Sequence, residues 1–204
     1  MDSLSEIRRE TGRRGHPPIP SVEPAAALPR AFPRILAIDY AKHTGWAVGS
    51  AEMMRVDAYG LWNLESRVAD LHANIQGACV KWNVVAIAYE DATFGSHQAH
   101  VQSMHNELRG IVKLVAAERG LPSRGYNPMT IKKFATGNGR AKKPQMIRAC
   151  RSLLGIDTDS DDVADACFIY ALAQAEWANT GRLETPVSKK TKHRRQQKKE
   201  RRLF

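Results

Sequence analysis

Four carboxylates mark the points where apolar segments of this chain meet polar sequence. Asp39 and Glu90 each follow a run of apolar residues directly, and Asp162 and Asp165 lie three apart at the start of a strongly hydrophobic segment. A carboxylate beside such segments is expensive to desolvate unless a positive partner meets it. We therefore expect a fold in which positive charge reaches these acids.

A hard divalent cation is a partner that all four acids could share. Strand ends beside the first turn of a helix can gather distant acids, and Asp162 and Asp165 would share one helix face. Mg²⁺ prefers such oxygen ligands. Each acid also has a simpler interpretation, as a turn residue or a helix cap. We interpret Asp157, Asp159 and Asp161 in that simpler way, as loop and cap residues.

Hydrophobic periodicity predicts an α/β fold with a mixed five-stranded sheet flanked by helices. The first three strands are joined by short turns and predict an antiparallel meander. The predicted strands cover residues 34–40, 45–49, 53–64, 84–90 and 123–127. The predicted helices begin near 66, 99, 128, 144 and 161 and end near 82, 119, 134, 154 and 179.

Composition divides the chain into three parts. Residues 1–33 contain six prolines and five arginines and predict a mobile arm, whereas residues 34–180 hold the predicted elements and form one domain. Residues 181–204 predict a disordered basic tail. From residue 186 onward nine lysines and arginines accompany one glutamate, which gives +8 of the formal net charge of +10. Basic runs of this kind commonly associate with nucleic acid or anionic membrane.

Other features favour a cytoplasmic protein without a membrane partner. No apolar run approaches the roughly 20 residues that span a bilayer. Three acids among the first ten residues argue against an organelle transit peptide. Cys79, Cys150 and Cys167 are odd in number and lack CxxC spacing, so we expect buried, reduced thiols.

The segments around the acids resemble the motifs of RuvC Holliday-junction resolvases. Residues 35–39 followed by 44–48 resemble the opening strands of that family, and residues 86–95 resemble its second motif. The segment 131–146, IKKFATGNGRAKKPQM, is the most specific match. Residues 162–166 supply the final motif at the expected distance. The motifs follow the order of the family across most of the chain.

The resemblance implies an RNase H-like fold, a homodimer and Mg²⁺-dependent cleavage of branched DNA. By position, Asp39, Glu90, Asp162 and Asp165 would be the metal-binding catalytic acids. Two Mg²⁺ ions about 4 Å apart, for which Mn²⁺ can substitute, can activate water, hold the strand and stabilise the leaving oxyanion. The long helix after Glu90 would include the dimer surface.

The resemblance also implies DNA contacts. Lys132 and Lys143 match family lysines that contact DNA or assist at the scissile phosphate, so Lys143 is also a candidate catalytic residue. Arg140 and Lys142 lie in the loop between them and would face phosphates. Many members place an aromatic residue three positions after the Glu; here that position is a threonine, and Phe94 follows it. The family's Pro-Gly after the first Asp is replaced by Tyr40-Ala41.

Two other interpretations of local motifs are disfavoured. The glycine-rich segment 136–140 lacks the Gly-Lys-Ser/Thr ending of a nucleotide-binding loop and follows a predicted helix. A flexible DNA-contacting loop fits it better. A zinc site is disfavoured because His100 and His105, on one helix, would point roughly 140° apart.

The sequence thus predicts an endonuclease that resolves Holliday junctions by paired symmetric nicks and leaves 5′-phosphate and 3′-hydroxyl ends. One alternative is a nuclease with broader branched substrates, such as flaps and forks. Another is a non-catalytic DNA-binding module on the same fold. Four intact acids argue against that module, because a phosphate binder gains nothing from anionic residues near its ligand.

Overall fold

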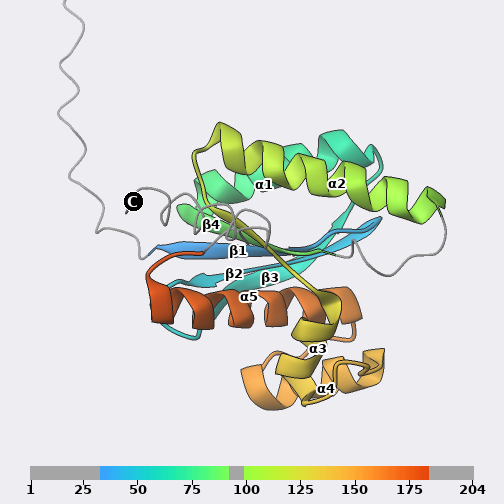
Figure 1. The fold of residues 1–204 in the computed structure, drawn as a ribbon, viewed down its shortest axis with the longest axis vertical. Helices are drawn as coiled ribbons and strands as arrows, with labels where there is room; N and C mark the ends of the chain where they lie inside the picture. The colour runs from blue at the N-terminus through green and yellow to red at the C-terminus, as the bar shows by residue number, and fades with distance from the viewer. Residues whose placement is uncertain (1–32, 92–98, 184–204) are drawn as a thin grey trace, which may run out of the picture. The chain divides into compact units, whose positions relative to one another are not determined.

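The computed structural model describes residues 33–91 and 99–183, which form a mixed sheet with helices on both faces (Figure 1). The strand order is β3-β2-β1-β4-β5; β1 pairs antiparallel with β2 and parallel with β4. β2–β3 is antiparallel and β4–β5 parallel. The strands are β1 Arg34–Asp39, β2 His43–Ser50, β3 Val56–Asn63, β4 Val84–Glu90 and β5 Ser123–Tyr126. The predicted five-stranded mixed sheet and its antiparallel meander are confirmed.

Two layers of helices cover this sheet (Figure 1). On one face lie α1 and α2, and on the other α5 packs against the strands, with α3 and α4 beside it. The helices are α1 Arg67–Trp82, α2 Ala99–Glu118, α3 Pro128–Thr136, α4 Lys143–Leu154 and α5 Asp161–Thr180. None of the described helices is long and apolar enough to cross a membrane.

Side-chain alternation along the strands divides the core into two halves. In β1, Ile35 and Ala37 pack on the α5 side, whereas Leu36 and Ile38 pack beneath α1 and α2. Successive side chains of a strand point to opposite faces, so both halves draw on one short strand. All four side chains are fully buried. This alternation decides toward which layer a residue at the end of β1 points.

The third strand begins later than the sequence predicts, at Val56 instead of Met53. The cause is a turn that the buried Tyr170 of α5 organises. Its hydroxyl lies 2.8–2.9 Å from the carbonyl oxygens of Ser50, Met53 and Arg55 and accepts a hydrogen bond from the Arg55 N–H. A tertiary contact more than 110 residues away in sequence therefore holds this segment out of the sheet.

Two glycines of β2 let α5 lie unusually close to the sheet. A Cβ atom on Gly45 would lie 1.9 Å from the carbonyl oxygen of Asp162, and one on Gly49 would lie 2.5 Å from the Tyr170 ring. Real Cβ atoms do not approach other atoms that closely. The start of α5, with its acids, is therefore seated directly on the strand beside β1.

Several predictions fall on residues that the structure does not describe. They concern the arm up to residue 32, the segment 92–98 that contains Phe94, and the tail from 184 onward. Within the described part, all three cysteines are free and buried, as predicted.

Candidate active site

Asp39 and Glu90 lie side by side because of sheet register. β1 and β4 are parallel neighbours, and Ala37 pairs with Ala88, so the strands end at the same edge with Asp39 and Glu90 two residues further on. Ala37 and Ala88 both belong to the core half on the α5 side. Since side chains two residues apart point to the same face, both carboxylates are directed toward α5.

The third carboxylate comes from α5. One oxygen each of Asp39, Glu90 and Asp165 can be chosen such that all three atoms lie within 4.8 Å of one another. Asp165 reaches this point because Gly45 lets the start of α5 lie on β2. Three residues separated by more than 50 positions in sequence thus share one small volume, which we call the acid cluster (Asp39, Glu90 and Asp165).

The fourth predicted acid, Asp162, is not part of the acid cluster. Three residues along a helix correspond to about 300° of rotation, so Asp162 and Asp165 share one face of α5, but about 4.5 Å of rise separates them along the helix axis. Asp162 is nevertheless close, because its charge raises the pKa of both Asp39 and Glu90. The predicted convergence of four acids therefore holds for three, with Asp162 at the edge.

Burial and mutual repulsion shift the titration of the acid cluster. Burial raises the pKa of Asp39 well above its ordinary value, and the charges of Glu90 and Asp165 raise it further. Burial, with the charge of Asp165, raises the pKa of Glu90 to about 7. The pKa of Asp165 rises to about 6, mainly through burial. Without a cation the cluster is electrostatically unfavourable at neutral pH.

The residues of the acid cluster fit a hard divalent cation. Oδ1 of Asp165 is buried and lacks a hydrogen-bond partner, a costly state for a carboxylate oxygen. All ligand atoms that the cluster offers to a metal are carboxylate oxygens, which Mg²⁺ and Mn²⁺ prefer. In the described part of the chain this is the only group of at least three His, Cys, Asp or Glu side chains that could hold an ion, and it contains no histidine.

Basic residues approach the cluster from two helices. The charge of Lys132, on α3, lowers the pKa of both Glu90 and Asp165 and so opposes the effect of burial. Lys143 is the first residue of α4, and its Nζ lies 2.5 Å from Oδ2 of Asp161. That side chain is 75% exposed, so it is accessible to a ligand above the cluster. Hydrogen bonding to Asp161 raises the pKa of Lys143.

Asp161 lies in the first turn of α5, as expected of an acid at a helix start, and it also binds a lysine. Sequence reasoning assigned it to the loop and cap; the N-cap itself is Ser160, whose Oγ accepts a hydrogen bond from the Val163 N–H. Asp161 holds Lys143. The lysine lies 18 positions earlier, at the start of another helix, so no local pattern indicated the pair.

A histidine that the sequence analysis did not select also lies near the site. Nδ1 of His43 is 2.9 Å from Oδ1 of Asn63, which pairs with it across β2 and β3. The charge of His43 lowers the pKa of Asp162, so the exposed imidazole lies at the rim of the acidic region. Its position four residues after Asp39 was the available signal.

The remaining predicted DNA-contacting residues do not belong to the acid cluster or fall outside the described residues. Lys142 is exposed and immediately precedes α4, and Arg140 lies in the loop after α3. Phe94 falls in the segment 92–98, so its predicted contact stays a prediction.

Comparisons with known proteins agree with this geometry. Residues 41–173 match the family model described as crossover junction endodeoxyribonuclease RuvC. The protein of that name from Moorella thermoacetica is 32% identical over 124 residues, which cover 60% of this chain and 73% of the relative. The protein of the same name from Magnetococcus marinus is 30% identical over 156 residues, covering 71% and 86%.

A solved structure shares the architecture. Thermus thermophilus RuvC in complex with Holliday junction substrate is 25% identical, with a TM-score of 0.60, and the match covers 72% of this chain and 96% of that one. The predicted RNase H-like fold is therefore confirmed. From the family match, the relatives and the shared fold, we conclude that this chain belongs to the RuvC family of crossover junction endodeoxyribonucleases.

Proposed function

We propose that this protein resolves Holliday junctions by paired symmetric nicks and requires Mg²⁺, for which Mn²⁺ can substitute. The observation that carries the proposal is the acid cluster, with three carboxylates from β1, β4 and α5 and a buried Asp165 oxygen that lacks a partner. Asp39, Glu90 and Asp165 would hold the metal. Asp162, at the edge of the cluster, would complete the ligands for two ions. Bound there, the ions would supply an activated water and stabilise charge on the phosphate.

Hydrolysis of a phosphodiester bond defines the roles that the neighbouring side chains would have. The oxygen of a water forms a bond to phosphorus, the bond to the 3′ oxygen breaks, and that oxygen takes up a proton. The products are a 5′-phosphate and a 3′-hydroxyl. Lys143, exposed and positioned by Asp161, is suited to meet the charge that develops on the phosphate. Lys132, Arg140, Lys142 and Phe94 are the proposed DNA-contacting residues.

Paired nicks require two active sites, so we propose a homodimer with α2 in its interface. Branched DNA is the proposed substrate, because a related structure is a complex with a Holliday junction. We further propose that the protein acts in the cytoplasm of a bacterial cell, because the relatives that it matches come from bacteria. The arm (1–33), nuclease domain (34–180) and tail (181–204) are the proposed division of the chain.

A labelled four-way junction, incubated with the protein and Mg²⁺, tests this function. We expect symmetric nicks that disappear with Asp39→Asn and persist with Asp159→Asn, a matched change in the exposed loop before α5. Equal cleavage of flaps and forks would favour the broader nuclease. Junction binding in EDTA without cleavage in Mg²⁺ or Mn²⁺ would favour the non-catalytic module.

A further inference from the structure

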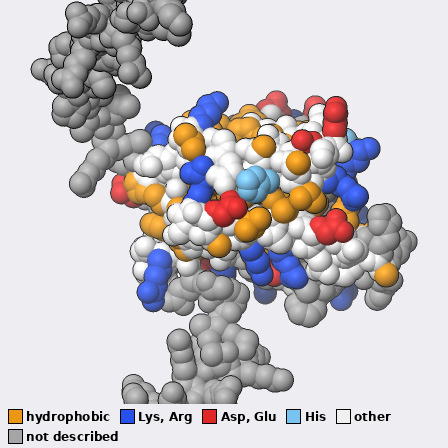
Figure 2. Space-filling view, turned by 90° about the horizontal axis from the view of Figure 1, so that it is seen from above, with side chains coloured by type: hydrophobic (Ala, Val, Ile, Leu, Met, Phe, Trp, Pro, Cys, Tyr) orange, Lys and Arg blue, Asp and Glu red, His pale blue; other side chains and the backbone are white. Residues whose placement is uncertain are grey.

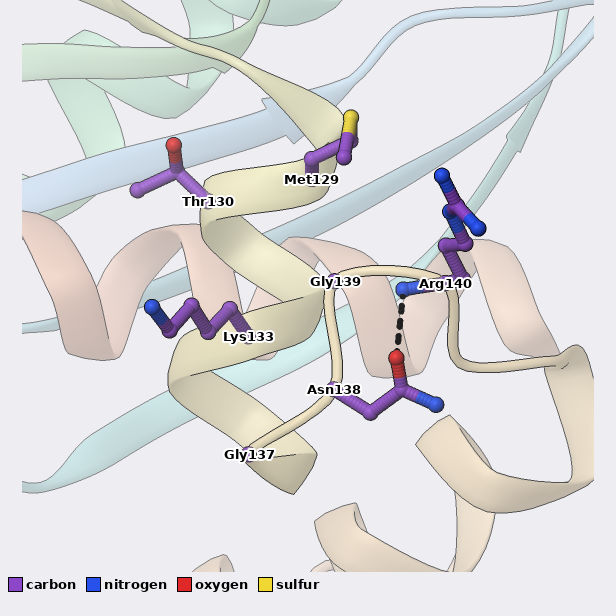
Figure 3. A pocket seen from close by; sticks show the side chains of 7 residues that line it. All are labelled: Met129, Thr130, Lys133, Gly137, Asn138, Gly139 and Arg140. Atoms are coloured by element: carbon purple, nitrogen blue, oxygen red, sulfur yellow. Dashed lines mark hydrogen bonds between the residues drawn. The ribbon is translucent and has the colours of Figure 1, made fainter.

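A cavity of about 860 Å³ lies where α3 meets the loop that follows it (Figure 3). Its lining combines two cations with small and polar residues and contains no acid. The lining residues are Met129, Thr130, Lys133, Gly137, Asn138, Gly139 and Arg140. In Figure 3 the side chains of Lys133 and Arg140 extend on opposite sides of the loop at Gly139. The cavity therefore has two separate positive groups along its length.

The loop that borders this open cavity is held by its own hydrogen bonds. Oδ1 of Asn138 accepts from the Arg140 N–H at 2.9 Å, and Oγ1 of Thr136 accepts from the Asn138 N–H at 3.2 Å. The Ala141 N–H donates to the Asn138 carbonyl. Gly137 adopts φ +76° and ends α3. The cavity is thus formed before any ligand arrives, which lowers the entropy cost of binding.

Hydrogen-bond donors predominate at this site. The Asn138 side chain uses its oxygen on the Arg140 N–H, which leaves its amide nitrogen free to donate. Lys133 and Arg140 make no ion pair with any residue in the described part of the chain. Met129 is 57% exposed and adds an apolar surface beside these donors. Donors, unpaired cations and an apolar side chain together fit a sugar–phosphate backbone.

The position of the cavity relates it to the acid cluster. Lys132 approaches Glu90 and Asp165, whereas the next residue, Lys133, lines the cavity. Consecutive helical residues point about 100° apart, so α3 presents one lysine to each place. By contrast, acidic and basic side chains are interspersed on the side of the molecule seen from above α1 and α2 (Figure 2).

We propose that this cavity is a second DNA site, separate from the acid cluster, that seats a stretch of backbone with one phosphate at Lys133 and another at Arg140. The inference rests on the proposed function, because it assigns the cavity to the DNA that the acid cluster would cut. Met129 would contact a sugar between the two phosphates. The site anchors a DNA arm and takes no part in the chemistry.

Binding of a labelled junction and of a plain duplex in EDTA, across salt concentrations, tests the proposal. Lys133→Ala and Arg140→Ala should each weaken binding several-fold and reduce the slope of log affinity against log salt by about 0.9. The double variant should lose about twice that slope. Lys133→Arg should retain most of the affinity. Lys81→Ala removes an equal charge from α1, on the other face of the sheet, and should change neither quantity.

A local readout tests the cavity itself. In NMR titrations with a short duplex, the Asn138 side-chain amide and the Gly139 N–H should shift in the wild-type protein and much less in the double variant. The proposal would be overturned if the salt slopes of Lys133→Ala and Arg140→Ala equalled that of Lys81→Ala. It would also be overturned if the Asn138 side-chain amide and Gly139 N–H signals of the wild-type protein did not shift with DNA. Binding is measured without Mg²⁺, so it does not depend on cleavage. A protein that bound DNA through this cavity but failed to cleave a junction would contradict the proposed function and not the DNA site.

Discussion

The acid cluster and the α3 cavity lie on adjacent parts of the same protein but are built on opposite principles. The cluster gathers like charges from β1, β4 and α5 at partly buried positions, where a bound cation or protonation can relieve the repulsion. The cavity places two exposed cations on one helix and the loop after it. Metal binding by the acid cluster therefore depends on how accurately distant segments pack. DNA binding by the cavity depends on local geometry and on the number of positive charges.

This difference has a consequence for how each region responds to mutation. A buried cluster that shares ions should lose function steeply when one ligand is removed, because its members act as a unit. Exposed cations that meet phosphates should contribute in small, nearly equal steps. Mutations in the two regions should therefore differ in the size of their effects.

The steepest loss is expected within the acid cluster. Asp165→Asn should reduce the single-turnover rate of junction cleavage on the order of 10³-fold, whereas Asp162→Asn should cost about 10- to 100-fold, since Asp162 lies at the edge. Gel-based cleavage at saturating protein measures both rates. Equal losses would show that Asp162 belongs to the cluster when metal is bound, and unchanged DNA affinity in EDTA serves as the control.

Gly45→Ala should damage the site without touching an acid. The new Cβ would collide with the backbone at Asp162, so α5 must shift away from β2. We expect a loss of about 1–3 kcal/mol in the free energy of unfolding and a cleavage rate lower by about 10-fold or more. Gly77→Ala in α1 meets no atom within 4 Å and should be neutral or stabilising by about 0.5–1 kcal/mol. If Gly45→Ala cleaved junctions at the wild-type rate, the close packing of α5 on β2 would not be needed to position the acid cluster.

The stability of the metal-free protein should depend on pH through the acid cluster. The pKa of Glu90 is raised from 4.5 to about 7 in the folded state, so the folded protein binds the proton more tightly than the unfolded chain. Stability is therefore lost as pH rises from about 4.5 through 7, by about 1–3 kcal/mol.

Thermal unfolding in EDTA between pH 5 and 8 measures this loss. Glu90→Gln should flatten the profile, and Glu65→Gln, an exposed control, should not. Mg²⁺ should restore more stability at pH 8 than at pH 5. A wild-type profile that matches Glu90→Gln would contradict the shifted titration.

The smallest effect on cleavage is expected for the basic tail. Deletion of residues 186–204 removes nine lysines and arginines and should flatten the salt dependence of DNA binding while the positions of the nicks stay unchanged. Fluorescence anisotropy across salt concentrations and mapping of the nicks measure the two quantities. An unchanged slope would exclude the tail from DNA binding, and moved nicks would give it a role in positioning.

Much of the architecture was predictable because it follows from local patterns. Apolar runs and turn residues predicted all five strands and all five helices, mostly to within a few residues. Asp39 and Glu90 stood out because an acid directly after a buried strand is unusual and costly. The helical spacing of Asp162 and Asp165 made them candidates for the same site, and resemblance to a known family then supported that grouping.

Other features of the site depend on contacts between distant segments. The ion pair of Lys143 with Asp161 joins the starts of two helices, and the Tyr170 hydroxyl of α5 holds the turn before β3 out of the sheet. In the sequence Gly45 is an ordinary strand residue, and its need to be glycine arises only from the close approach of α5. Each depends on how layers pack, which alternation and capping rules do not specify.

Hydrophobic periodicity and backbone preferences were enough to identify the charged residues, the buried strands and most boundaries of strands and helices. Packing between distant segments was needed to bring three acids, and not four, within 4.8 Å of one another, and to direct Lys132 toward the acid cluster and Lys133 toward the cavity. The physical reason is distance: electrostatic and coordination geometry change over a few ångströms, and only the packing of α5 and α3 on the sheet sets positions that finely.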